Sequence, residues 1–123
     1  MQHPNFFILY VNDPLASAAF YAQLLGRPAV EAAPTFAMFA LESGVMLGLW
    51  SRHTVEPAAS AGGGGAEVAI ALDSVDEVNV THQRWQALGL PVIQAPTQMD
   101  FGYTVVATDP DGHRLRVFAA NRD

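Results

Sequence analysis

Apolar and polar positions follow the same order twice along this chain. A short apolar run at residues 5–11 precedes a segment of helical spacing that ends near Gly26, and several apolar runs follow it. A second run at residues 67–72 precedes another helical segment, ending near Gly89, and again several apolar runs follow. Apolar runs of this length between turn residues indicate strands. The pattern therefore predicts a duplicated unit of strand, helix and three strands, which is an α+β fold.

Start and stop signals delimit both helices. Asp13 is suited to an N-cap and Pro14 to a first helical position, and Gly26 can take the left-handed conformation that ends a helix. Ser74 and Glu77 have the spacing of a capping box at the second helix. We therefore expect helices to residues 25 and 88. The expected core-facing side of the second helix consists of Val75, Val78, Trp85 and Leu88.

The remaining apolar runs supply the other strands. In the first half they cover residues 29–32, 36–41 and 45–50; in the second half they cover residues 91–95, 102–108 and 113–119. Between the halves, Pro-Ala-Ala-Ser-Ala followed by four glycines cannot bury apolar area and is interpreted as a linker. We expect one domain of two βαβββ modules, residues 1–56 and 67–123, joined by a linker at 57–66, with a curved mixed sheet around a cleft.

Composition narrows the function classes. The formal net charge is −6, with six arginines and no lysine, which argues against a nucleic-acid partner and against anionic membrane surfaces. The chain has no cysteine, so disulfides and thiolate chemistry are excluded. No apolar stretch is long enough to span a membrane, and the N-terminus lacks the features of a secretory signal. We expect a cytoplasmic location.

Several motifs resemble the vicinal oxygen chelate superfamily, which includes glyoxalase I, extradiol dioxygenases, fosfomycin-resistance transferases and bleomycin-binding proteins. The motifs are Tyr-Val-Asn-Asp at 10–13, Ser-Ala-Ala-Phe-Tyr at 17–21, Leu-Leu-Gly at 24–26 and Asp-Pro-Asp-Gly-His-Arg-Leu at 109–115. The resemblance covers nearly the whole chain. It implies the two-module fold with a cleft, but it does not select one activity.

In the members of that superfamily that use a metal, the resemblance places the ligand positions at Phe6, Gly48, Glu67 and Arg116. A divalent metal needs several oxygen or nitrogen donors. Phe6 and Gly48 have no side-chain donor, and Arg116 is a permanent cation. We therefore expect no metal and no other cofactor, with an ion pair between Arg116 and Glu67 as the local charge arrangement.

Within the superfamily, the chain most resembles phenazine-antibiotic resistance proteins. The matching features are Leu-Gly-Leu-Trp-Ser at 47–51, Glu67, Phe-Gly-Tyr-Thr at 101–104 and Asp-Pro-Asp-Gly-His-Arg-Leu-Arg-Val at 109–117. Those proteins bind flat aromatic antibiotics in the cleft of a dimer without a metal. The resemblance implies metal-free binding and sequestration of a planar aromatic antibiotic or metabolite, phenazine-like or bleomycin-like, by a homodimer.

Strand alternation indicates which side chains share a face with the ligand positions. Including the loop before the strand at 102–108, the candidate ligand-binding residues are Phe6, Tyr10, Met46, Gly48, Trp50, Glu67, Phe101, Tyr103, Arg116 and Phe118. Several of them have a second interpretation. Trp50 is equally suited to a core or dimer contact, and Gly48 to the relief of packing. Arg116 is suited to the Glu67 ion pair, to a ligand carboxylate, or to both.

Phe101 and Tyr103 are interpreted either as a lid over the ligand or as a hydrophobic plug. The alternative function is a glyoxalase-type or dioxygenase-type lyase or isomerase that acts on a small molecule. A third possibility is a metal-free enzyme in which Glu67 is the general base, although a neighbouring arginine would hold that carboxylate in an ion pair. No two histidines have metal-ligand spacing on one element, and no catalytic set is assigned.

Overall fold

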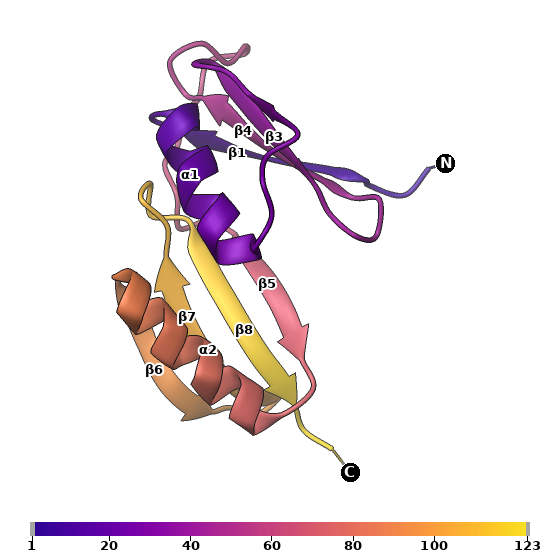
Figure 1. Ribbon diagram of the computed structural model, residues 1–123, viewed down its shortest axis with the longest axis vertical. Helices are drawn as coiled ribbons and strands as arrows, with labels where there is room; N and C mark the ends of the chain where they lie inside the picture. Colours follow the sequence, from indigo (N-terminus) through magenta and orange to yellow (C-terminus); the bar gives the residue numbers. More distant parts are fainter. Residues whose placement is uncertain (1, 123) are drawn as a thin grey trace. The chain divides into compact units, whose positions relative to one another are not determined.

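Each half of the chain folds into one helix and a four-stranded mixed sheet (Figure 1). The structure is a computed structural model that describes residues 2–122. It divides into two compact units between Gly62 and Gly63, within the stretch predicted as a linker. The predicted α+β class and the duplicated order of elements are confirmed. Within residues 2–122, no helix combines the length and apolar character that crossing a bilayer requires.

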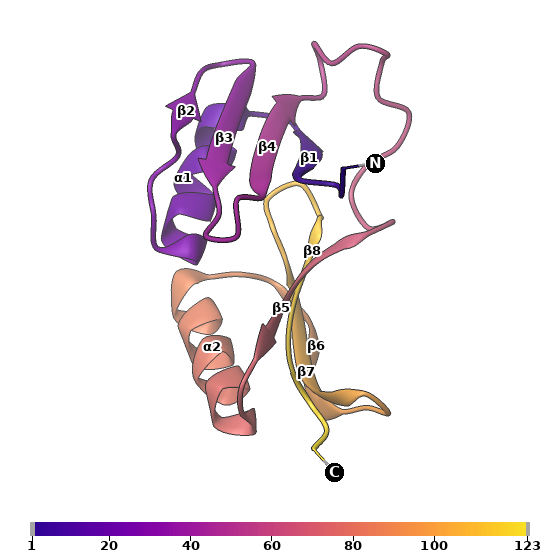
Figure 2. The same ribbon diagram turned by 90° about the vertical axis from the view of Figure 1, so that its right-hand side faces the viewer.

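The first unit contains a sheet in the order β1-β4-β3-β2, with α1 along one face (Figure 2). Strand β1 runs parallel to β4, whereas β3 is antiparallel to both β4 and β2. The elements are β1 Phe6–Val11, α1 Pro14–Leu25, β2 Glu31–Ala32, β3 Phe36–Ala40 and β4 Met46–Ser51.

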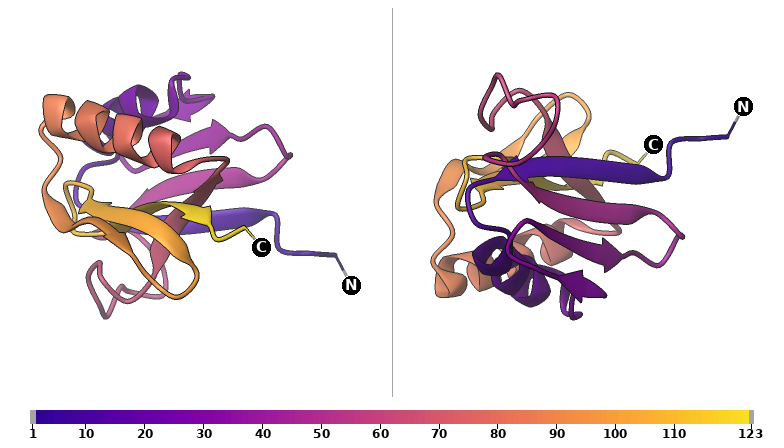
Figure 3. Two further views of the ribbon diagram at one scale, coloured as in Figure 1. Left: turned by 90° about the horizontal axis from the view of Figure 1, so that it is seen from below. Right: turned by 90° about the horizontal axis from the view of Figure 1, so that it is seen from above.

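The second unit repeats this arrangement with the order β5-β8-β7-β6, and α2 lies along one face of its sheet (Figure 3, left). Strand β5 is parallel to β8, and β7 is antiparallel to both β8 and β6. The elements are β5 Glu67–Leu72, α2 Val75–Leu88, β6 Val92–Gln98, β7 Gly102–Thr108 and β8 Arg114–Ala120.

The start of α1 is capped as the sequence predicts. The Asp13 carboxylate accepts hydrogen bonds from the backbone N–H groups of Leu15, at 3.1 Å, and Ala16, at 3.3 Å. Gly26 ends the helix with a φ of 69°, in the left-handed region that glycine adopts without strain. The chain therefore turns back toward the sheet immediately after α1.

The start of α2 differs from the predicted capping box in one contact. The Ser74 hydroxyl accepts from the N–H of Glu77 at 3.1 Å, as expected. The Glu77 carboxylate accepts instead from the N–H of Asp73 at 2.9 Å, one residue before the cap. Both contacts still satisfy backbone donors at the end of β5 and the start of α2.

Each core lies between the helix and one face of its sheet. The buried side chains include Val11, Tyr21, Phe39 and Leu49 in the first unit and Val78, Trp85, Val105, Leu115 and Val117 in the second. Two residues expected in the second core are outside it, because Val75 is 47% exposed and Leu88 is 41% exposed. They are the first and last residues of α2, so its buried contacts come from the inner turns.

The side chain of Asp109, the first residue of the turn at 109–112, stabilises this turn by hydrogen bonds to backbone N–H groups. The Asp109 carboxylate accepts from the N–H groups of Asp111, at 2.8 Å, and His113, at 2.9 Å. Gly63 packs against this turn, since a Cβ added there would lie 2.6 Å from the His113 nitrogen. Gly63, within the stretch predicted as a linker, is therefore in close backbone contact with the turn of the second unit.

Candidate functional site

The face of the first sheet opposite α1 carries aromatic and apolar side chains. The strand register places Phe6 beside Met46 and Tyr10 beside Trp50, with Gly48 between the two pairs. Helix α1 lies along the other face of the sheet (Figure 3, right). The side chains on that face form the buried core of this unit. The first open face is defined as Phe6, Ile8, Tyr10, Phe36, Met38, Met46, Gly48 and Trp50. It contains all five candidate residues that the sequence places in this unit.

Two phenylalanine rings meet above Gly48. A Cβ on Gly48 would lie 2.9 Å from Cε1 of Phe6 and 3.0 Å from Cζ of Phe36. The Phe36 ring also makes an edge-to-face contact with Trp50, with 6.1 Å between ring centroids. Of the two interpretations of Gly48, its geometry corresponds to the relief of packing, because the space above it is filled by rings of the protein itself.

Phe36 is a site residue that the sequence reasoning missed. It lies directly opposite Trp50 in the β3–β4 register. The hairpin turn at 42–44 contained the necessary signal, because counting back from it pairs these two positions. Phe6 is 42% exposed and Tyr10 is 40% exposed, whereas Phe36 and Trp50 are half-buried. The first open face thus presents aromatic surface to its surroundings.

The second sheet carries a mixed polar and aromatic face opposite α2. In β8, Arg116 and Phe118 alternate with Leu115 and Val117, which are buried in the core. Glu67 lies on the neighbouring strand β5, on the same face as Arg116. The second open face is defined as Glu67, Gln94, Phe101, Thr104, Arg116 and Phe118.

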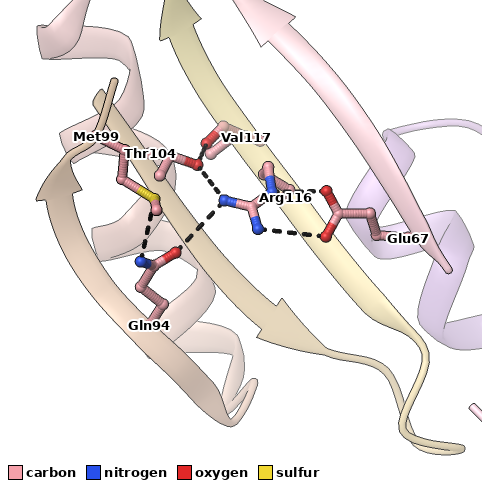
Figure 4. Close-up of polar contacts among 6 residues, drawn as sticks. All are labelled: Glu67, Gln94, Met99, Thr104, Arg116 and Val117. Atoms are coloured by element: carbon pink, nitrogen blue, oxygen red, sulfur yellow. Dashed lines mark hydrogen bonds and ion pairs between the residues drawn. The ribbon is translucent and has the colours of Figure 1, made fainter. Parts of the chain in front are cut away.

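A hydrogen-bond network surrounds Arg116 (Figure 4). Its Nε donates to Oε1 of Glu67 at 2.7 Å and its Nη2 donates to Oε2 at 3.3 Å. Its Nη1 donates to the Thr104 hydroxyl at 3.1 Å and to the Gln94 side-chain oxygen at 3.4 Å. The Thr104 hydroxyl in turn donates to the Val117 carbonyl at 2.9 Å. The predicted ion pair between Arg116 and Glu67 is confirmed.

This network uses most of the donor capacity of Arg116. A guanidinium has five N–H groups, and four hydrogen bonds from it are made to Glu67, Thr104 and Gln94. The Arg116 side chain is 17% exposed and that of Glu67 is 33% exposed. The carboxylate is therefore the more accessible member of the pair.

Gln94 and Thr104 are further residues that the sequence reasoning missed. Thr104 is a fully buried polar residue within the apolar strand β7. Its register across the turn at 109–112 places it beside Phe118, two residues from Arg116. A polar residue in a buried strand is a usable signal, because such a group requires a hydrogen-bond partner. Gln94 carried no comparable signal, since the register of β6 is irregular.

One aromatic ring on the second open face lies over the guanidinium, and a second ring contacts the first. Phe101 and Phe118 are in edge-to-face contact, with 5.7 Å between ring centroids. The Cζ of Arg116 lies 5.8 Å from the centroid of the Phe101 ring, within the range of a cation–π contact. Phe101 is 44% exposed, so part of its ring is accessible.

Tyr103 lies apart from these side chains. It is paired with Ala119 and therefore alternates with the residues of the second open face. Its hydroxyl donates to Oδ1 of Asn79, on α2, at 2.8 Å. The structure thus places Tyr103 on the helix-covered side of the sheet, and we leave it out of the site. Phe101, by contrast, is brought to Arg116 and Phe118.

The four positions that the resemblance assigns to metal ligands do not fit a divalent ion. In the first unit, Phe6 and Gly48 offer no side-chain donor. In the second unit, the Arg116 guanidinium lies 2.7 Å from Glu67, where it would repel a cation. Among residues 2–122, no group of three or more His, Cys, Asp or Glu side chains is positioned to hold a metal ion.

Comparison with known proteins identifies a matching family model and a similar protein of known name. The family model of the Glyoxalase/Bleomycin resistance protein/Dioxygenase superfamily matches residues 3–117. The phenazine antibiotic resistance protein EhpR of Enterobacter agglomerans is 28% identical over 117 residues, which cover 93% of this chain and 89% of EhpR.

Solved structures extend the comparison. A protein of Agrobacterium tumefaciens, solved by NMR in solution, is 52% identical with a TM-score of 0.91, covering 99% of this chain and 100% of that one. A glyoxalase-related enzyme from Fulvimarina pelagi is 22% identical with a TM-score of 0.84, covering 97% of this chain and 88% of that one. The second likeness concerns the fold alone.

Proposed function

The chain belongs to the glyoxalase/bleomycin resistance protein/dioxygenase superfamily, and we propose that within this family it binds and sequesters a planar aromatic antibiotic or metabolite without turnover. Its similarity to a phenazine antibiotic resistance protein supports this ligand class. Phenazines are flat fused-ring molecules, and aromatic side chains are the natural partners of such rings.

The observation that carries the proposal is the aromatic surface on the open faces. On the first open face, Phe6 and Phe36 lie over Gly48, and Phe36 contacts Trp50. Phe101 and Phe118 contact each other on the second. Stacking or edge contact between aromatic rings contributes about 0.5–1.5 kcal/mol beyond the burial of apolar area. Several such contacts together can hold an aromatic ligand, and none of them requires a chemically reactive side chain.

The polar groups of the second open face support binding rather than catalysis. Both carboxylate oxygens of Glu67 accept hydrogen bonds from Arg116. Proton abstraction by Glu67 would break this two-point pair and leave the guanidinium, 17% exposed, without its counterion. Among Phe6, Gly48, Glu67 and Arg116, only Glu67 offers a metal-ligand donor, which is too few for Lewis-acid chemistry.

Isothermal titration calorimetry with phenazine tests the proposal. The wild-type chain is expected to bind saturably, and Trp50→Ala or Phe118→Ala should weaken binding by about 1–3 kcal/mol, depending on which open face holds the ring. Trp85→Phe is the matched control, because Trp85 is 3% exposed in the core under α2. Absence of saturable binding, or equal affinity in all three variants, would overturn the proposal.

Two further measurements separate sequestration from the enzymatic alternative. Mass spectrometry of the ligand after incubation should recover it unchanged, whereas a product would indicate a lyase or isomerase. Elemental analysis of protein purified without chelators should find no stoichiometric zinc, nickel, manganese or iron. One bound ion per chain would contradict the metal-free account.

Homodimer formation is part of the same proposal. Strand β1 lies at the edge of its sheet, and its residues Phe6, Phe7 and Ile8 are 42%, 55% and 42% exposed. An edge strand with large apolar side chains favours association with a second copy. Light scattering coupled to size-exclusion chromatography should give twice the 13.2 kDa chain mass. A monomer mass at all concentrations would contradict this part.

A further inference from the structure

We propose that Glu67 makes the second open face selective for fused-ring aromatic ligands that carry a neutral hydrogen-bond donor, and that Arg116 does not read a ligand carboxylate. The inference rests on the proposed function and assigns the chemistry of the ligand substituent. It starts from a difference between the two members of the ion pair. The N–H groups of Arg116 already donate hydrogen bonds to protein side chains, whereas the Glu67 carboxylate can accept further hydrogen bonds.

Arg116 is committed to its own side-chain partners. Its Nε and Nη2 contact Glu67, and its Nη1 contacts Thr104 and Gln94. A ligand carboxylate needs two parallel N–H groups for the bidentate contact that arginine favours. Glu67 already occupies that position. An incoming anion would have to displace it.

Glu67 keeps acceptor capacity that Arg116 does not use. An ionised carboxylate accepts about four hydrogen bonds, and Glu67 accepts two from Arg116. Its side chain is 33% exposed, about twice the 17% of Arg116. The group of this ion pair that a ligand can reach is therefore mainly a hydrogen-bond acceptor, the Glu67 carboxylate. An amino, hydroxyl or amide N–H group satisfies that acceptor, whereas a carboxylate is repelled by it.

The aromatic rings place such a ligand within reach of Glu67. Phe101 lies 5.8 Å from the Arg116 guanidinium carbon, and the guanidinium contacts Glu67 at 2.7 Å. A fused-ring molecule lying against Phe101 extends across the guanidinium toward the carboxylate. The formal net charge of −6 adds a long-range term that also disfavours anions.

Three matched probes test the inference: phenazine, 2-aminophenazine and phenazine-2-carboxylate, titrated by calorimetry near pH 7. Hydrogen bonds to charged groups predict that 2-aminophenazine binds about tenfold more tightly than phenazine. The carboxylate should bind about tenfold more weakly than phenazine because it faces Glu67. This series uses the wild-type chain alone, so it does not depend on the folding of a variant.

Glu67→Gln retains the size of the side chain and removes its charge, and it should shrink the difference between the amino and carboxylate probes by about tenfold or more. Glu42→Gln is the matched control, because Glu42 forms a separate ion pair with Arg27 in the first unit; all three affinities should be unchanged. Equal affinities for the three probes, or tighter binding of the carboxylate, would overturn the inference while the proposed function stands. If no probe binds, the proposed function fails, and the inference fails with it.

Discussion

Arg116 holds Glu67 across two neighbouring strands through hydrogen bonds of 2.7 Å and 3.3 Å. Strand β5, which carries Glu67, lies at the edge of its sheet and pairs only with β8 among the described strands. The pair thus joins the first strand of the second unit to its last.

Removing Glu67 tests the structural role of this pair. Glu67→Ala leaves the Arg116 guanidinium without its counterion, and the free energy of unfolding in urea should fall by about 1–3 kcal/mol. Glu42→Ala is the control, since Glu42 is 90% exposed in its pair with Arg27. An exposed pair contributes about 0–1 kcal/mol. Equal effects of the two variants would contradict the account.

A glycine at position 48 is predicted to be required for stability, because the Phe6 and Phe36 rings leave no room for a side chain there. In Gly48→Ala the added methyl group meets Phe6 and Phe36 at about 3 Å, so the rings must move, at a cost of about 1–3 kcal/mol in stability. Phe36 contacts Trp50, so the indole N–H signal of Trp50 should shift in the NMR spectrum. Gly62→Ala, which meets no atom within 4 Å, should change neither measurement. An unshifted signal with wild-type stability in Gly48→Ala would refute the packing argument.

Tyr103 is predicted to stabilise the fold and to make no contribution to the binding of the ligand. Tyr103→Phe removes the hydrogen bond to Asn79, and the free energy of unfolding should fall by about 0.5–1.5 kcal/mol. The affinity for phenazine should remain at the wild-type value. Loss of affinity with unchanged stability would return Tyr103 to the binding surface.

Alanine substitutions at two adjacent glycines, Gly62 and Gly63, are predicted to have very different effects on the melting temperature. In Gly63→Ala the methyl group would lie 2.6 Å from the His113 nitrogen and 2.7 Å from the Gly112 carbonyl carbon. Because backbone atoms cannot rotate away, the melting temperature should fall by several degrees, which corresponds to about 1 kcal/mol or more. Gly62→Ala has open space around it and should melt like the wild-type chain. Identical melting of both variants would show that the linker end is not packed on the turn.

Local signals in the sequence were sufficient to locate both helices and the order of the elements. Asp13 and Gly26 delimit α1 because a side-chain acceptor and a left-handed glycine act within a few residues of their own position. The same local rules located α2, but they did not reveal that Glu77 caps Asp73. They also placed Val75 and Leu88 in the core, although helix ends extend beyond the packed turns.

The site was harder to predict because it depends on register. Alternation grouped Phe6 with Tyr10 and Arg116 with Phe118, and the chemistry of a half-buried arginine indicated Glu67 as its partner. Thr104 and Phe36 required pairing across hairpins, which hydrophobicity alone does not specify. Tyr103 was grouped with Phe101, but Phe101 lies before β7, whereas Tyr103 lies within the strand and faces the side opposite to its neighbour Thr104.

The most direct test of the central claim is a titration of isotope-labelled protein with phenazine, followed through the indole N–H signals of its two tryptophans and the backbone amide signal of Phe118. Trp50 lies on the first open face, whereas Trp85 is 3% exposed under α2. We predict a saturable shift of the Trp50 indole signal if the first open face holds the ring, or of the Phe118 backbone amide signal if the second one does, with the Trp85 indole signal unmoved in either case. Movement of the Trp85 signal alone, or no saturable change at Trp50 and at Phe118, would contradict the proposal.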